Sequence, residues 1–100
     1  MDLNQTKVID QVDEKAIVDL ASELIKIPSF KLEETPVATF LDEFFRDRGY
    51  KVDLQEVEPG RFQTIATLEG TGGGPSLMLN GHTDINSLTR RWRRDPWVPV

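Results

Sequence analysis

The apolar residues of this chain change their spacing once, at Gly49, and that change limits the folds open to it. Before Gly49, two segments repeat apolar residues at helical spacing, over about residues 10–26 and 35–48. After it, apolar and polar residues alternate over residues 50–57, as in a half-buried strand. The sequence therefore predicts two helices followed by strands, with residues 1–9 as a polar lead-in outside the helices.

The residues at the start of each predicted helix leave more than one possible first residue. Asp10 and Asp13 both suit the N-terminus of the first helix, which begins between them, because carboxylates accept from free amides and favour the helix dipole. The second helix has two possible starts: Thr35-Pro36 as N-cap and first helical residue, or Glu33 with the proline inside the first turn.

The strand region contains two turn signals. Glu58-Pro59-Gly60 predicts a turn, so that residues 61–69 pair back on the first strand as a hairpin. The glycine-rich residues 70–75 predict a second turn. Residues 76–80, "SLMLN", then form a third strand, and their uninterrupted apolar run indicates burial on both faces. Beyond Asp84 only a loop is predicted.

This element order indicates the α/β class. A strand covered on both faces needs more cover than two helices supply, so we expect residues 1–100 to be the N-terminal portion of one larger domain, with no second domain. The alternative is a small, complete α+β domain with an exposed tail.

Composition excludes several function classes. The net charge of −5 argues against general nucleic-acid binding. The chain has no cysteine, which removes disulfides and thiolate zinc sites. No apolar run approaches the ~20 residues of a membrane span, and the polar start does not look like a signal peptide. We therefore expect a cytoplasmic protein that contacts no membrane.

Three further features favour ordinary structural roles. "GTGGG" precedes a predicted strand rather than a helix, so a turn is favoured over a phosphate loop. The arginines of Arg90–Arg94 predict a solvated loop, although they could attract an anionic substrate. The carboxylates of Glu33-Glu34 and Asp42-Glu43 are expected on solvated faces.

The only histidine, His82, stands two residues before Asp84, directly after the apolar run. Alternate residues of an extended chain point to the same side, so both side chains could enter one crevice. An imidazole is a good zinc ligand, and a nearby carboxylate can orient it. On this pair alone a loop histidine with a hydrogen-bonded aspartate is favoured, because zinc needs three or four ligands.

A second motif favours the interpretation of His82 as a zinc ligand over that of an ordinary loop histidine. Gly81-His82-Thr83-Asp84 is followed by Trp92-Arg93-Arg94-Asp95-Pro96-Trp97-Val98-Pro99. Together they resemble the zinc-dependent amidohydrolase and metallopeptidase family of acetylornithine deacetylase, succinyl-diaminopimelate desuccinylase, aminoacylase and carboxypeptidase G. The resemblance covers about Asp10 to Val100 and implies the N-terminal part of a mixed-sheet catalytic domain.

The resemblance also implies a site and a reaction. His82 matches the family's first zinc ligand, and Asp84 matches the aspartate that orients and tunes the site. The family holds two divalent ions, zinc or alternatively cobalt or manganese, and cleaves amide bonds of small N-acyl amino acids or peptides. Its intact members are often homodimers.

The remaining ligands and the general base of the family have no counterpart in this sequence, and a bridging aspartate is expected soon after Val100. We therefore expect a truncated, inactive fragment of such a hydrolase. The alternative hypothesis is a non-catalytic interaction module that uses Arg90–Arg94 on an acidic partner.

Overall fold

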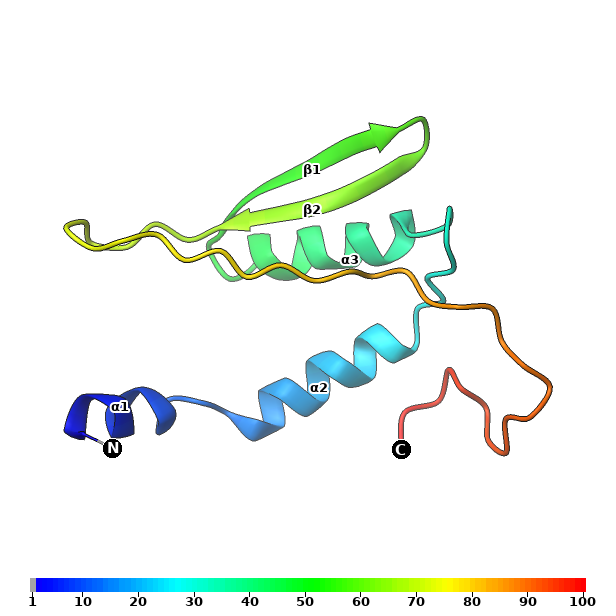
Figure 1. Cartoon of the computed structure of the whole chain (residues 1–100), viewed down its shortest axis with the longest axis horizontal. Helices are drawn as coiled ribbons and strands as arrows, with labels where there is room; N and C mark the ends of the chain where they lie inside the picture. Colours follow the sequence, from blue (N-terminus) through cyan, green and yellow to red (C-terminus); the bar gives the residue numbers. More distant parts are fainter. Residues whose placement is uncertain (1) are drawn as a thin grey trace. The chain divides into compact units, whose positions relative to one another are not determined.

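The structure is a computed structural model that describes residues 2–100. Its elements are, in chain order, α1 (Leu3–Ile9), α2 (Glu14–Ile25), α3 (Thr35–Arg46), β1 (Lys51–Glu58) and β2 (Arg61–Thr67), as Figure 1 shows. The helices and the antiparallel hairpin confirm the predicted α/β class. The chain divides into two compact units, of which one is Pro28–Arg91 and the other combines the segments on either side of it.

The N-terminal lead-in was predicted to lie outside the helices, and this is wrong, because residues 3–9 form α1. Asp2 accepts a 2.8 Å hydrogen bond from the Gln5 amide, and the Gln5 side chain accepts a 3.0 Å bond from the Asp2 amide. This reciprocal capping box satisfies two amides that the first turn leaves without helical partners.

Helix α2 confirms the first predicted helix. Asp13 caps it, since its carboxylate accepts from the Ala16 amide at 3.2 Å. The helix has no buried residue, although its apolar side chains follow helical spacing. Ile17 and Val18, for example, are 57% and 61% exposed. The apolar spacing therefore predicted the helix correctly without predicting its burial.

Helix α3 begins between the two starting points that the sequence left open. Thr35 is its first residue, Glu34 is the N-cap and Pro36 lies in the first turn, where its missing amide costs nothing. The Thr35 side chain does not cap the helix; its hydroxyl donates a 2.7 Å hydrogen bond to the Gly60 carbonyl in the hairpin turn. Gly49, with φ +83°, follows the helix C-terminus.

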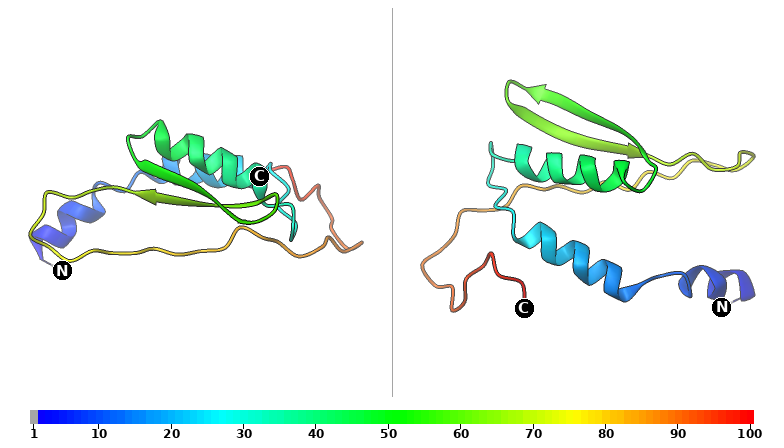
Figure 2. Two further views of the ribbon diagram at one scale, coloured as in Figure 1. Left: turned by 90° about the horizontal axis from the view of Figure 1, so that it is seen from above. Right: turned by 180° about the vertical axis from the view of Figure 1, so that it is seen from behind.

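The predicted hairpin is confirmed, and α3 lies along one face of it (Figure 2). Val52 of β1 is paired with Ala66 of β2 and is buried with Val37 and Ala38 of α3. The Thr64 hydroxyl donates to the Ala38 carbonyl at 2.7 Å, which joins the middle of β2 to the first half of the helix. This helix-on-hairpin layer is the core of the Pro28–Arg91 unit.

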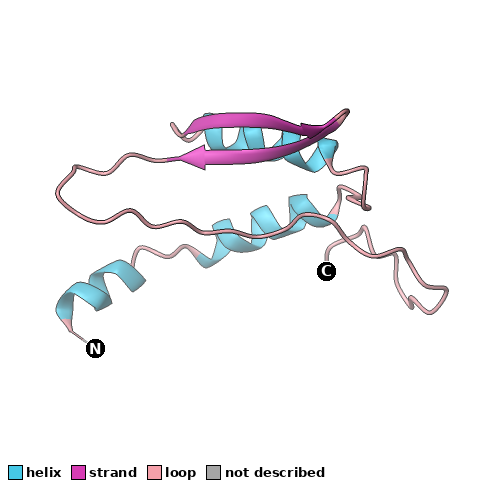
Figure 3. Cartoon of the chain, turned by 45° about the horizontal axis from the view of Figure 1, so that its top comes forward, coloured by secondary structure: helices cyan, strands magenta, loops and turns pink. Residues whose placement is uncertain are grey.

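The predicted third strand over residues 76–80 is wrong. The segment forms no strand and is drawn as loop in Figure 3. Leu77, Met78 and Leu79 are 84%, 86% and 87% exposed, whereas burial on both faces was expected. A strand exists only where a neighbouring backbone accepts its hydrogen bonds, and among the described residues this run pairs with none.

Candidate functional site

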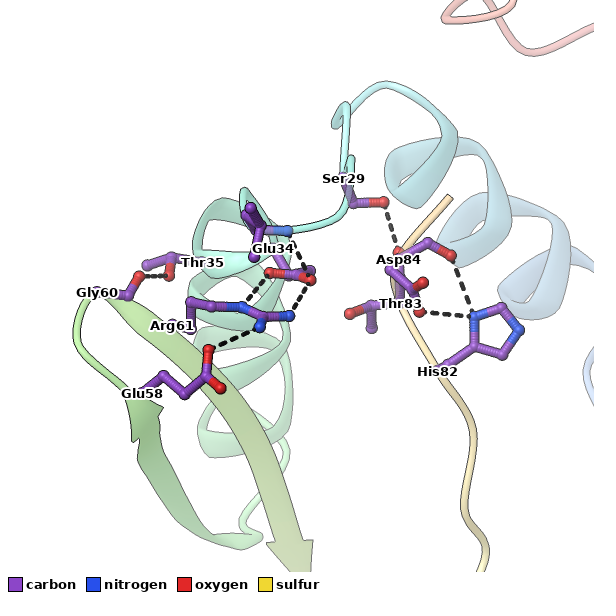
Figure 4. Close-up of polar contacts among 10 residues, drawn as sticks. Ser29, Glu34, Thr35, Glu58, Gly60, Arg61, His82, Thr83 and Asp84 are labelled. Carbon is purple, nitrogen blue, oxygen red and sulfur yellow. Dashed lines mark hydrogen bonds and ion pairs between the residues drawn. The ribbon is translucent and has the colours of Figure 1, made fainter. Parts of the chain in front are cut away.

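His82 and Asp84 are in direct contact, as Figure 4 shows. The His82 Nδ1 atom lies 3.2 Å from Asp84 Oδ1 and 3.1 Å from the Asp84 carbonyl oxygen. Both neighbours are acceptors, so of the two tautomers of a neutral imidazole they favour the one that carries its proton on Nδ1. The lone pair of that imidazole then resides on Nε2, on the opposite side of the ring. The exposed His82 side chain is thus oriented by Asp84.

The backbone around Asp84 is attached to the segment that precedes α3. The Ser29 hydroxyl donates a 2.6 Å hydrogen bond to the Thr83 carbonyl, and the Ile85 amide donates a 3.0 Å bond to the Ser29 carbonyl. Phe30 and Ile85 form an isolated parallel bridge beside these bonds. Ser29 is buried, and no sequence motif singled it out, because no local pattern links residues 54 positions apart.

An ion pair fixes the other end of this segment. Arg61 donates from Nη2 to Glu34 Oε1 at 2.8 Å and from Nε to Oε2 at 3.3 Å. Glu34 also accepts a 3.0 Å bond from the Leu32 amide, which supports a turn in which Leu32 has φ +77°. The predicted solvated position of Glu34 is therefore wrong: it is 8% exposed because Arg61 and α3 cover it.

These bonds shift the pKa values of both Glu34 and Arg61. The Arg61 hydrogen bond lowers the pKa of the Glu34 carboxyl from 4.5 to about 2, against an opposing effect of burial, and the Leu32 amide adds to the lowering. The Arg61 guanidinium has a raised pKa because it donates to Glu34 and to Glu58, the latter at 2.9 Å. Both groups are fully charged at neutral pH.

The second half of the sequence motif forms a turn. The Asp95 carboxylate accepts a 2.9 Å bond from the Trp97 amide, and the Asp95 carbonyl accepts a 3.2 Å bond from the Val98 amide. An aspartate that bonds the amide two residues later closes an Asx turn. In this conformation Asp95 stabilises the turn in which it lies.

Two other predicted loops are confirmed. Gly72 and Gly73 adopt φ +91° and +81° in the glycine-rich segment, and no helix follows them, so the turn interpretation holds over the phosphate-loop one. The arginines between Arg90 and Arg94 are exposed, as expected of a solvated loop. Their attraction for an acidic partner stays a prediction. None of the described helices has the length and apolar character of a membrane span.

The described residues do not complete a metal centre. Across residues 2–100, no three histidine, cysteine, aspartate or glutamate side chains converge as metal ligands would. His82 and Asp84 offer one imidazole nitrogen and one carboxylate, whereas a zinc site uses three or four ligands. The donor types suit a divalent metal, but their number does not, and the assignments of His82 and Asp84 stay predictions.

Known proteins with sequences similar to this chain include a deacetylase, a desuccinylase and an aminoacylase. Acetylornithine deacetylase of Vibrio campbellii is 39% identical over 71 residues, covering 69% of this chain and 18% of the relative. Succinyl-diaminopimelate desuccinylase of Anaplasma marginale is 30% identical over 83 residues, or 82% and 22% of the two chains. Aminoacylase-1 of Mus musculus is 39% identical over 61 residues, or 59% and 15%.

The matched region is a small part of each relative, since the chain spans about a fifth of the length of the relatives that it matches. No family model matches the chain, and no solved structure matches it.

Proposed function

We propose a function from the premise that this chain belongs to the amidohydrolase family of acetylornithine deacetylase, succinyl-diaminopimelate desuccinylase and aminoacylase. The proposal is that the whole protein hydrolyses an amide bond in a small N-acyl amino acid or peptide. The observation that supports this most is the contact between His82 and Asp84. In this contact the aspartate of the Gly-His-x-Asp motif can orient the histidine. The motif stands in a chain whose sequence is similar to these relatives.

The contact between the two residues supports the part proposed for each. Asp84 accepts from Nδ1 and so holds the imidazole ring in one orientation and one tautomer. His82 would then offer Nε2 as one ligand of a divalent metal, for which we propose zinc, with cobalt or manganese as alternatives. For these two residues we propose metal binding and ring orientation; among the described residues no further histidine or carboxylate converges with them as a third ligand.

The test uses the protein translated from its gene to the natural stop codon. Hydrolysis of N-acetylornithine, N-succinyl-diaminopimelate and a series of N-acetyl amino acids is measured before chelation, after chelation and after zinc is returned. The proposal expects hydrolysis of at least one amide, its loss on chelation and its recovery with zinc. If the metal-supplemented protein hydrolyses none of them, or hydrolyses them equally well after chelation, the proposal is wrong.

Two finer expectations remain predictions of the sequence. One is the cytoplasmic location, and the other is a homodimer of the kind that the family often forms.

A further inference from the structure

We infer that Ser29 is a positioning residue for the His82 and Asp84 pair, an inference that rests on the proposed function. Ser29 lies outside the Gly-His-x-Asp motif, and we infer that it acts through the backbone of that motif. Its side chain and its backbone both bond to the short stretch that contains the pair.

The two bonds of Ser29 lie on opposite sides of Asp84. The hydroxyl holds the Thr83 carbonyl, in the peptide unit before Asp84, and the Ser29 carbonyl holds the Ile85 amide, in the unit after it. Fixing both neighbouring peptide units restricts rotation of the backbone at Asp84. The Asp84 carboxylate therefore remains within reach of the His82 Nδ1 atom.

The exposures of these residues show where the restraint originates. His82 and Asp84 have side chains that are 85% and 50% exposed, so packing around them supplies little rigidity. Ser29 is only 6% exposed. Because Ser29 is enclosed by the protein, it moves less than the solvent-facing His82 and Asp84 and can restrain their backbone. Such a restraint matters because functional side chains must be held within a fraction of an ångström.

Ser29 is in turn held by the segment that leads into α3. Glu34 closes the end of that segment through Arg61 of β2 and through the Leu32 amide. The hairpin therefore contacts Glu34, the chain leads back from Glu34 to Ser29, and Ser29 bonds to the backbone at Thr83.

The test compares Ser29→Ala with Thr64→Val in the protein expressed to its natural stop codon. Thr64 is the matched control, because its hydroxyl also donates to a backbone carbonyl from a partly buried position, at 2.7 Å, but on the hairpin. Three quantities are measured: native-state hydrogen exchange of the Ile85 amide in the metal-free protein, zinc affinity, and kcat and KM for the amide substrate.

We expect Ser29→Ala to speed exchange at Ile85 and to lower zinc affinity or kcat about 10-fold, the usual effect of losing a group that orients a ligand, with little change in KM. Thr64→Val should leave all of these near wild type. The inference is overturned if exchange at Ile85 is unchanged in Ser29→Ala, or if both variants lower affinity and kcat equally. The exchange measurement needs neither metal nor substrate, so it tests the restraint at Asp84 even if the proposed function fails.

Discussion

Arg61, the first residue of β2, binds both carboxylate oxygens of Glu34, the N-cap of α3, at 2.8 and 3.3 Å. The pair joins the hairpin to the segment that carries Ser29. A two-point contact between guanidinium and carboxylate fixes direction as well as distance, which a lysine would not do. The pair therefore restrains the position of the α3 N-cap relative to the start of β2.

Acid should weaken this link. The folded pKa of Glu34, about 2, lies below its ordinary value of 4.5, so the unfolded chain binds the proton more tightly. The stabilisation is complete above about pH 4.5 and is lost as the pH falls toward 2. Glu34→Gln should lower the stability at neutral pH, and its difference from wild type should shrink over that interval. Chemical denaturation at several pH values measures this.

Glu33→Gln is the matched control, because Glu33 is the exposed neighbour of Glu34 and lies outside this ion pair. It should follow the wild-type pH dependence. If Glu34→Gln and Glu33→Gln gave the same curves, the ion pair would have no measurable part in stability.

Shortening the buried valine of β1 should destabilise the core between α3 and the hairpin. Val52→Ala removes two methyl groups from a side chain that is 9% exposed, and we expect a loss of about 2 kcal/mol. Val57→Ala on the same strand removes the same atoms from a side chain that is 60% exposed, and should change stability by no more than about 0.5 kcal/mol. Equal losses in urea unfolding would contradict the assigned face of β1.

The hairpin turn should require glycine at position 60. Gly60 has φ +77°, and its carbonyl accepts the Thr35 hydroxyl, so a side chain there strains the backbone that holds this bond. Gly60→Ala should cost about 1–2 kcal/mol. Gly74→Ala, at a glycine without positive φ, is the control and should be close to neutral. A neutral Gly60→Ala in thermal unfolding would show that the turn has another conformation.

Asp84→Asn should test the orienting role separately from metal ligation. The amide keeps the size of the side chain but removes its charge and makes it a weaker acceptor for the His82 Nδ1 proton. We expect zinc affinity or amide hydrolysis to fall about 10- to 100-fold in the whole protein. Titration calorimetry with zinc gives the first quantity. Wild-type affinity and activity together would remove Asp84 from the site.

The sequence predicted those elements whose signals are local. The end-capping aspartate of α2, the proline near the start of α3 and the Pro59-Gly60 turn each act within a few residues. Helix α1 was missed even though Asp2 and Gln5 have capping-box spacing, because its apolar spacing is short and weak.

What depends on distant partners was not predicted. Residues 76–80 contain an uninterrupted apolar run, as a strand buried on both faces would, but an apolar run cannot supply the neighbouring backbone that a strand needs. Glu34 was placed in solvent because the residue that covers it, Arg61, stands 27 positions away. The bond between Ser29 and Thr83 spans 54 positions and follows from no periodicity. The closeness of His82 and Asp84 was predictable, since residues two apart on an extended chain point to the same side.

The most direct test of the proposed site is the metal content of the whole protein with and without His82. Metal per chain is measured by mass spectrometry after gel filtration, alongside hydrolysis of the preferred amide. His82→Ala should lose bound metal and hydrolysis, while thermal unfolding of the metal-free variant stays near that of the metal-free wild type, because the side chain is 85% exposed. A His82→Ala protein that kept both its metal and its hydrolysis would contradict the assignment of His82 as a ligand.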